Sequence, residues 1–586
     1  MAKRKDATKT VKPAAAPAPS PSSNPRIPPP RSKPSPLRTF ILLIRIASCC
    51  FALYVLWKRM HPPKAETDLA EDDKRIWFED IEVDEVRQQA VLEAFKHSYS
   101  AYERDAFGFD DYHPISHRGS NMSPAGPVGY FVIDSLDSLL LTNSTKEYKR
   151  ARDWVEKLSF DLDDKYHTFE ASFPSITIRV LGGLLSAYHL SGESDRMLLD
   201  KAVDLADRLL PAFDTPSGLP LSFVNLKTRQ GIADKDNRGW TSVAEAGTQL
   251  EFKYLSHLTG KKVYWQKVEK VMDVIREQPN KDGLVPIFMR PDTGSFVFSD
   301  IRLGSRGDSY YEYLSKQYFQ TNRTEPVYLD MHNEAMGGIK KLLLKKSATK
   351  GLMYVSELLP RRKAEGTLSV LTPRWSTLLK RQDHLVCFLG ATFLLGASNS
   401  NTLPLPPDEL TFSESQLDDW VAGKGLIRTC VDTYTSSKTG LAPEIVNFYL
   451  RAADAKAAGR DWFINSRKLT YPEPPIDARN ILRPETAESL FVAYRVTGDP
   501  MYRSWGWTIF QAFEKHCKLP AGGYASIRDV DALPVQHEDR METFWLSETL
   551  KYLYLLFSDK NLLPLDRYVF STEAHPLPVF TPTRFR

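Results

Sequence analysis

The sequence predicts an all-α protein in which paired helices repeat around a toroid or along a solenoid. Apolar residues with a period near 3.6 run into a glycine-containing turn, and a second helical run follows. Glycine at a helix C-terminus adopts the left-handed turn that lets the next helix pack back antiparallel. Repeated hairpins in one long chain indicate a toroid or solenoid, and a toroid has a central cavity. The expected pairs are 184–192 with 197–210, 252–260 with 263–276, and 491–498 with 502–516.

The size and charge of the chain exclude some functions. At 586 residues, 42% hydrophobic and 11% aromatic, the chain can bury a large core. The net charge of +4 is small for this length, so bulk charge gives no support to nucleic-acid binding. We expect no nucleic-acid partner and a monomeric protein.

The N-terminal region predicts a membrane anchor. Residues 1–38 hold ten prolines and nine Lys or Arg against one Asp, a composition that indicates a disordered tail. Residues 39–57 are nearly all apolar, and nineteen residues at helical rise span about 28 Å, close to the hydrocarbon thickness of a bilayer. A cleaved signal peptide is the alternative, but a long tail precedes the run and no small-x-small site follows it. We therefore expect a signal anchor, an acidic stem at 58–76 and a catalytic domain at 77–586.

The orientation of this anchor rests on glycosylation motifs. Basic residues flank the span on both sides, so their distribution does not fix the topology. Sequons at Asn121, Asn143 and Asn322 favour a lumenal C-terminal portion. The sequence thus predicts a type II membrane protein whose tail is cytosolic.

Two regions lack helical periodicity. Residues 283–306 contain β-like apolar stretches, and residues 399–408 are rich in proline. We expect both to form surface hairpins and loops. The basic residues at 340–350 are expected to form a solvated face.

The segment Arg483-Pro-Glu485-Thr-Ala-Glu488 heads an apolar helical run. Glu485 and Glu488 are three residues apart and share one helix face, where like charges repel unless a cation lies near. An ordinary helix start is the alternative, since proline and acidic residues are favoured there.

Further acidic residues occur in similarly apolar surroundings. A single buried acid is usually ion-paired and structural, but so many in one chain indicate a shared acidic pocket. A structural toroid whose acids form only ion pairs remains the alternative. The set is Asp134, Asp137, Glu170, Glu245, Glu251, Asp308, Glu312, Glu444, Glu485, Glu488, Glu548 and Glu573.

An acidic pocket with oxygen ligands suits calcium. The EF-hand spacing, HExxH, paired CxxC and a serine nucleophile elbow are all absent from the sequence. The remaining chemistry is carried by carboxyl groups, as in glycoside hydrolysis by an acid and a base. Phe544, four residues before Glu548, is placed to stack on a sugar ring.

Five cysteines leave little scope for disulfides. Cys49 and Cys50 fall in the apolar span, and at most one pair can form among Cys387, Cys430 and Cys517.

Several motifs resemble those of glycoside hydrolase family 47, the class I α-1,2-mannosidases that trim high-mannose N-glycans. The resemblance extends from about Trp77 to Pro576. The motifs are Asp134-Ser-Leu-Asp137, Thr177-Ile-Arg179, Asp308-Ser-Tyr-Tyr-Glu312, His384-Leu-Val-Cys387, Arg483-Pro-Glu485-Thr, Phe544-Trp-Leu-Ser-Glu548 and Thr572-Glu-Ala-His575.

The resemblance implies an (α/α)7 barrel with small β-hairpin insertions, bound Ca2+ and an inverting mechanism. Glu485 matches the base that activates water, Asp308 matches an acid acting through water, and Thr572 matches the direct calcium ligand. Cys387 and Cys430 match the family's disulfide, which leaves Cys517 free. The implied substrate-binding residues are Arg179, Glu245, Glu251, Arg306, Glu312, His384, Arg483, Glu488, Phe544, Glu548 and Glu573.

Arg306 resembles the endoplasmic reticulum subgroup, in which a single mannose is removed. The implied location is the endoplasmic reticulum membrane with a lumenal catalytic domain, and the Golgi membrane is the alternative.

Two departures from the family pattern affect the site. The family's catalytic acid precedes the arginine of Thr-Ile-Arg by four residues, where this chain has Ser175. We assign the acid to Glu170, which an extra Ala171–Ser175 follows, and Pro174 would break a helix there. Glu245 and Glu251 are six residues apart instead of seven, and one deletion turns a helix by about 100°. A glycan-binding quality-control protein with weak or no hydrolysis is therefore the alternative function.

Overall fold

The computed structural model describes residues 81–168, 175–247, 249–361, 374–398, 412–465 and 474–582. The predicted tail, membrane span and stem lie outside these residues, as do Glu170 and the proline-rich loop. Within the described ranges, no helix combines the length and apolar character needed to cross a bilayer.

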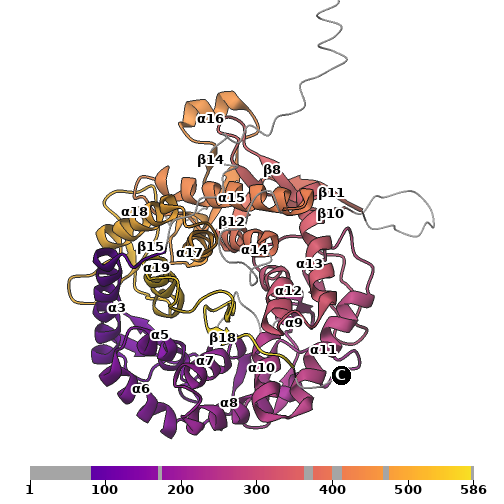
Figure 1. The fold of residues 1–586 in the computed structure, drawn as a ribbon, viewed down its shortest axis with the longest axis vertical. Helices are drawn as coiled ribbons and strands as arrows, with labels where there is room; N and C mark the ends of the chain where they lie inside the picture. The colour runs from indigo at the N-terminus through magenta and orange to yellow at the C-terminus, as the bar shows by residue number, and fades with distance from the viewer. Residues whose placement is uncertain are drawn as a thin grey trace, which may run out of the picture. The chain divides into compact units, whose positions relative to one another are not determined.

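The described residues are mostly helical, and consecutive helices pack as seven pairs. Figure 1 shows the first helix of each pair on the inner side of a ring and the second on the outer side. The last pair joins the two ends of the described chain. The pairs are α5 (Leu136–Leu141) with α6 (Thr145–Lys157), α7 (Gly182–Leu190) with α8 (Arg196–Leu209), α10 (Leu250–Thr259) with α11 (Lys262–Glu277), α12 (Asp308–Gln320) with α13 (Pro326–Gly338), α14 (Phe388–Ala397) with α15 (Glu414–Thr435), α17 (Glu485–Thr497) with α18 (Pro500–His516), and α19 (Leu550–Leu556) with α3 (Glu85–Asp105).

The three helical hairpins predicted from the sequence are confirmed. Each predicted glycine turn has a left-handed backbone, with φ of 70° at Gly192, 69° at Gly260 and 67° at Gly498. Every residue of α17 is buried, whereas α8 buries one apolar stripe. A helix that is buried all round belongs to the core, and a striped helix covers it. Burial therefore agrees with the inner and outer positions of these two helices.

Short helical segments connect the pairs. Three are π-helical, a form that often marks functional sites. The π-helical segments are η1 (Thr177–Leu181), η3 (Ile339–Leu343) and η7 (Trp545–Thr549), the 3-10 turns are η2 (Leu210–Phe213), η4 (His384–Cys387) and η6 (Ile476–Ala478), and the short α-helices are α4 (Tyr130–Asp134), α9 (Val243–Ala246) and α16 (Ala452–Ala458).

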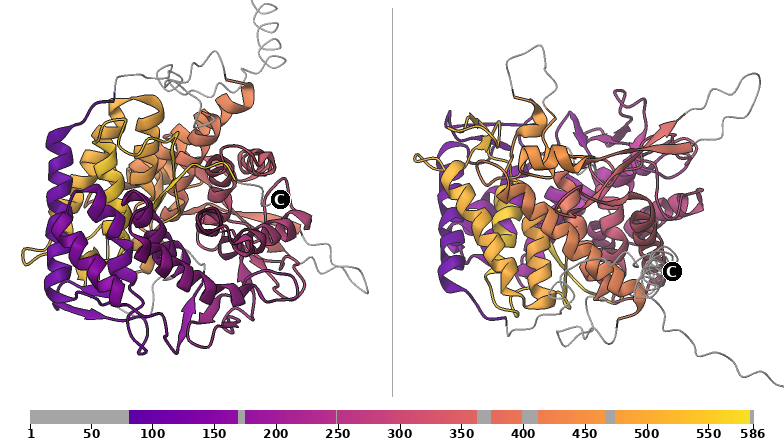
Figure 2. Two further views of the ribbon diagram at one scale, coloured as in Figure 1. Left: turned by 60° about the horizontal axis from the view of Figure 1, so that its bottom comes forward. Right: turned by 90° about the horizontal axis from the view of Figure 1, so that it is seen from above.

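The strands form small antiparallel sheets, as expected. The β10–β11 hairpin projects outward from the helices (Figures 1 and 2), and the β17–β18 hairpin enters the middle of the ring (Figure 1). The sheets are β1 (Asp111–His113) with β2 (Arg118–Ser120), β3 (Lys165–His167) with β4 (Phe223–Asn225) and β5 (Gln230–Ile232), β6 (Thr241–Ser242) with β7 (Phe288–Met289), β8 (Leu344–Lys346) with β9 (Met353–Val355), β10 (Glu357–Arg361) with β11 (Arg374–Leu379), β12 (Arg381–Asp383) with β13 (Ile445–Phe448) and β14 (Trp462–Phe463), β15 (Ser526–Ile527) with β16 (His537–Glu538), and β17 (Tyr568–Phe570) with β18 (Pro576–Pro578).

The β-like stretch at 283–306 corrects one expectation. It is not wholly a surface hairpin, because Val285, Ile287 and Met289 are buried. Strand β7 pairs with β6 directly before α9, and Val285 and Met289 belong to the hydrophobic core.

The predicted disulfide is confirmed. Cys387 at the end of η4 bonds Cys430 on α15, with 6.0 Å between their Cα atoms. Cys517 is buried and free, as expected. The bridge anchors the last residue of η4, the turn that begins with His384.

Candidate active site

The β17–β18 hairpin and the inner helices enclose an acidic pocket. The segments that form it lie far apart in the sequence, so only the tertiary fold brings them together. The lining residues are Arg179 on η1, Asp308 and Glu312 on α12, Leu385 and Phe388 around η4, Arg483, Pro484, Glu485 and Glu488 at the start of α17, Phe544 and Glu548 at η7, and Thr572 and Glu573 in the hairpin.

Glu485 is held as an ionised carboxylate. His384 Nδ1 lies 2.8 Å from Glu485 Oε2, and Arg483 Nη1 lies 3.5 Å from Glu485 Oε1. Burial raises the pKa of Glu485, but the His384 hydrogen bond and the Arg483 charge outweigh burial and lower the net pKa below its ordinary value. Glu485 can therefore accept a proton at neutral pH.

Asp308 has the opposite character. Its Oδ1 accepts a hydrogen bond from Ser309 N at 2.8 Å, and its buried Oδ2 has no partner within the described residues. Burial raises the pKa of Asp308 to about 7, with further contributions from Glu312 and Glu485. Two carboxyl groups with pKa values displaced in opposite directions are typical of an acid and a base.

Glu312 and Glu488 form the pocket floor, which is the part of the lining in contact with Lys316. Lys316 Nζ is 2.5 Å from Glu312 Oε1 and 3.2 Å from Glu488 Oε1. Burial raises the pKa of Glu488 to about 8, although Lys316 opposes this increase. The acidic pair therefore shares a single lysine.

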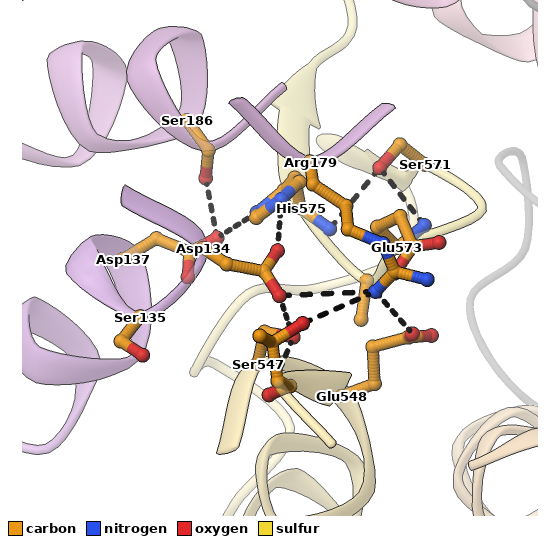
Figure 3. A network of polar contacts seen from close by, with 12 residues as sticks. Asp134, Ser135, Asp137, Arg179, Ser186, Ser547, Glu548, Ser571, Glu573 and His575 are labelled. Carbon is orange, nitrogen blue, oxygen red and sulfur yellow. Dashed lines mark hydrogen bonds and ion pairs between the residues drawn. The ribbon is translucent and has the colours of Figure 1, made fainter. Parts of the chain in front are cut away.

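Arg179 joins the pocket to the hairpin. Its Nη1 contacts Glu573 Oε2 and lies 4.0 Å from Glu548 Oε1 (Figure 3). Burial raises the pKa of Glu573 to about 7 despite this contact. The guanidinium groups of Arg179 and Arg483 lie 5.6 and 5.9 Å from the centroid of the Phe544 ring. Phe544 is thus fixed at the pocket wall.

A second charged cluster lies behind the hairpin (Figure 3). His575 Nδ1 is 2.8 Å from Asp137 Oδ2, and His575 Nε2 is 3.3 Å from Asp134 Oδ1. Lys551 Nζ lies 2.8 Å from Asp137 Oδ1. Asp134 and Asp137 are therefore ion-paired and do not line the pocket, so the expectation of one shared pocket is wrong for them.

Glu444 is also paired outside the pocket lining. Both of its carboxylate oxygens accept from Arg483 Nε, at 2.8 and 2.9 Å. Glu444 therefore orients the arginine that contacts Glu485.

Glu245 and Glu251 are buried but are not among the residues that line the pocket. Glu245 Oε2 accepts from Thr241 Oγ1 at 2.8 Å and from Ser222 Oγ at 3.1 Å, and Glu251 Oε1 accepts from Tyr313 OH at 3.0 Å. Burial raises the pKa of Glu251 to about 7. Their six-residue spacing does not rotate a continuous helix, because α9 ends at Ala246 and α10 begins at Leu250.

Two other expected substrate-binding residues do not line the pocket. His384 bonds Glu485 through Nδ1 and lies 3.1 Å from Tyr434 OH through Nε2. Arg306 packs on the Phe288 ring at 5.2 Å and has a left-handed backbone, with φ of 74°. His384 acts on Glu485, whereas Arg306 belongs to the β6–β7 region.

The expected acid Glu170 lies outside the described residues. Ser175, which has the position that the family gives to this acid, is buried, and its hydroxyl donates to Thr168 O at 2.8 Å. Thr168 N donates in turn to Ser222 O, next to the Glu245 hydroxyl contacts. Thr168, the last described residue before Glu170, is thus linked to Glu245 through Ser222.

The pocket lining is rich in oxygen atoms, which are the ligands that calcium prefers. Within the described ranges, no three His, Cys, Asp or Glu side chains cluster tightly enough to hold a metal ion. Thr572, however, lines the pocket together with buried carboxyl groups, and burial raises the pKa of two of them, Glu488 and Glu573. An oxygen-rich site of this kind suits Ca2+ with water as part of its shell.

Comparison with known proteins identifies related enzymes. The sequence profile of glycosyl hydrolase family 47 matches residues 94–579. Mannosyl-oligosaccharide 1,2-alpha-mannosidase of Candida albicans is 45% identical over 505 residues, covering 84% of this chain and 83% of the relative. Endoplasmic reticulum mannosyl-oligosaccharide 1,2-alpha-mannosidase of Schizosaccharomyces pombe is 39% identical over 536 residues, covering 90% and 94%. The solved structure of the alpha-1,2-mannosidase from Trichoderma reesei superposes with a TM-score of 0.72 at 27% identity, covering 85% of this chain and all (100%) of that chain.

Proposed function

The chain belongs to glycosyl hydrolase family 47 and is a glycosidase, and we propose that it is a calcium-dependent, inverting exo-α-1,2-mannosidase. Its substrates would be high-mannose N-glycans on glycoproteins, from which it removes one terminal mannose. The seven helix pairs and the hairpin in their centre support an (α/α)7 barrel as the scaffold.

The main support for this proposal is that the pKa of Asp308 is raised whereas that of Glu485 is lowered. Glu485, with its lowered pKa, would take a proton from the water that attacks the anomeric carbon. Asp308, with a pKa of about 7, would supply a proton through water to the leaving oxygen as the glycosidic bond breaks. Glu170 is the further candidate for the acid.

The remaining pocket residues would hold the terminal mannose. The Phe544 ring offers an apolar face for the sugar, and the carboxylates accept hydrogen bonds from its hydroxyls. Thr572 would hold calcium through its hydroxyl and carbonyl, with water bound by the surrounding carboxylates. The ion, when bound, would orient two hydroxyls of the mannose.

The cellular location is part of the proposal. Relatives of this chain from Homo sapiens and Schizosaccharomyces pombe are named endoplasmic reticulum enzymes. A signal anchor at 39–57 and a lumenal domain agree with such a location, with the Golgi as the alternative, and Arg306 supports removal of a single mannose.

The test is to incubate the full-length protein with a high-mannose glycan and follow the product anomer by NMR. We expect β-mannose first, loss of turnover with a chelator, and recovery with Ca2+. The rate should be bell-shaped in pH: it falls at low pH as Glu485 is protonated and at high pH as Asp308 loses its proton near pH 7. Absence of mannose release with and without Ca2+ would exclude the enzyme activity.

The glycan-binding alternative has one specific observation in its favour. Ser175 replaces a carboxyl group at the position that the family gives to its acid. Glu170→Gln distinguishes the two functions, because normal turnover that this change abolishes would rule out a purely binding protein.

A further inference from the structure

Lys316 is a buried cation in contact with two pocket carboxyl groups, Glu312 and Glu488, and the proposed reaction does not use it. It is 4% exposed and follows Asp308 and Glu312 on α12 at intervals of four residues. Residues with this spacing share one helix face. The face therefore presents two acids to the pocket and then one ammonium group behind them.

The contacts of Lys316 join two inner helices. Its ammonium donates to Glu312 on its own helix and to Glu488 on α17, at 2.5 and 3.2 Å. Glu488 lies one turn from Glu485. Lys316 thus fixes the position of α12 relative to the helix that starts with the proposed base.

A small rear cavity shares Glu488 with the pocket and shows why the contact between Lys316 and Glu488 matters. Glu488 lines both spaces, and Lys316 lines only the rear one. The other residues of the rear cavity are apolar or aromatic, among them Phe319, Leu395 and Val492. A carboxylate next to such a wall is costly unless a cation or donor satisfies it.

Among the described residues, Lys316 is the one cation that forms an ion pair with Glu488. Glu312 and Glu485 add negative charge beside it, and Tyr552 on α19 faces it as a neutral group. Without Lys316, neither floor carboxyl group would have a cation to hold it in place, and burial would raise the pKa of Glu488 still further. Their oxygens would then no longer be fixed acceptors.

We propose that Lys316 is a positioning residue for the mannosidase reaction: its ammonium holds Glu312 and Glu488 as paired acceptors for sugar hydroxyls at the pocket floor. The inference rests on the proposed function, since it assigns the pocket to the sugar. It predicts an effect on substrate binding larger than that on the chemical step.

Lys253 provides a matched control. It lies on α10, is fully buried at 0% exposure, and pairs with Glu269 at 2.6 Å and Glu325 at 2.8 Å. None of these three residues lines the pocket. Lys253→Met removes the same kind of buried bridge without touching the site.

The experiment compares Lys316→Met, Lys316→Arg and Lys253→Met in the full-length protein. Measurements are KM and kcat on a high-mannose glycan, inhibition by free mannose, and Tm. Since a hydrogen bond to a charged group contributes about 1.5–3 kcal/mol, we expect Lys316→Met to raise KM and the mannose inhibition constant by ~10–100-fold. Lys316→Arg should restore most of the affinity, and Lys253→Met should lower Tm at unchanged KM.

Unchanged KM in Lys316→Met, with a loss of Tm like that of Lys253→Met, would overturn the inference and leave a structural role. If Lys316→Met does not fold, Lys316→Gln replaces it, and wild-type KM in that variant would equally overturn the inference. Absence of turnover in the wild type would instead contradict the proposed function. In that case, the lysine variants would still be compared by their glycan affinity, measured by titration calorimetry.

Discussion

The acidic pocket and the His575 cluster are two buried sets of charges that share Arg179, and they differ in how well the charges are matched. In the cluster, Asp134 and Asp137 face His575, Lys551 and Arg179. In the pocket, six carboxyl groups face Arg179, Arg483 and Lys316.

The pKa values follow this difference. Burial alone raises the pKa of Asp137, but Lys551 and His575 lower it to about 2. In the pocket, burial prevails and raises the pKa of Asp308 to about 7 and that of Glu488 to about 8. Matched charges stabilise a fold, whereas unmatched charges remain available to a sugar, a cation or a proton.

The largest expected effect is on activity when the pocket's base is removed. Glu485→Gln keeps the shape of the side chain but cannot take a proton from water, so kcat should fall by ~10²–10⁴-fold. Steady-state kinetics and Tm are the measurements. A retained kcat would show that Glu485 is not the base, and a large loss of Tm would mean that its role is structural.

The next largest effect is on stability when the matched cluster is broken. Asp137→Asn leaves Lys551 without its buried carboxylate and His575 with Asp134 alone, which costs about 3–5 kcal/mol of unfolding free energy. Urea unfolding measures this loss. The assignment of a stabilising role to the His575 cluster would be contradicted if Asp137→Asn were as stable as wild type but had a greatly reduced kcat.

The matched cluster should also make stability depend on pH. Burial lowers the pKa of His575, but Asp137 and Asp134 raise it from 6.5 to about 9. A raised histidine pKa stabilises the fold fully below pH 6.5, and this contribution is lost as pH rises towards 9. About 3 kcal/mol of unfolding free energy should disappear over this range. Urea unfolding at several pH values is the measurement, and His575→Gln, which should flatten the slope, is the control.

The smallest expected effect concerns Glu444, which lies outside the pocket lining and pairs with Arg483 of the pocket. Glu444→Gln weakens the charge-assisted bonds to Arg483, which orients Glu485, so kcat/KM should fall by ~10-fold. The measurement is kcat/KM, with Glu269→Gln as a control away from the pocket. An unchanged kcat/KM would show that Arg483 needs no such support.

The sequence predicted much of the pocket because its residues belong to short motifs. Six of the twelve acids line it, together with Arg179, Arg483, Phe544 and Thr572. The sequence did not predict which acids would be fully ion-paired and which would not. Asp137 and Glu488 both occur in apolar helical sequence, and only the fold gives Asp137 two cations and leaves Glu488 to share one.

Lys316 shows the same limit. Its spacing from Asp308 and Glu312 was visible in the sequence, but its contact with Glu488 joins residues 172 positions apart. Helical periodicity shows which residues share one face of a helix. It does not show which residues from other segments contact that face.

The sequence by itself determined the helical hairpins and their glycine turns, since periodicity and backbone freedom are local properties. Its family motifs also identified the disulfide pair. Only the tertiary structure decided which acids are matched and which remain unmatched, because electrostatic energies depend on distance and burial, and both are set by segments remote in the chain.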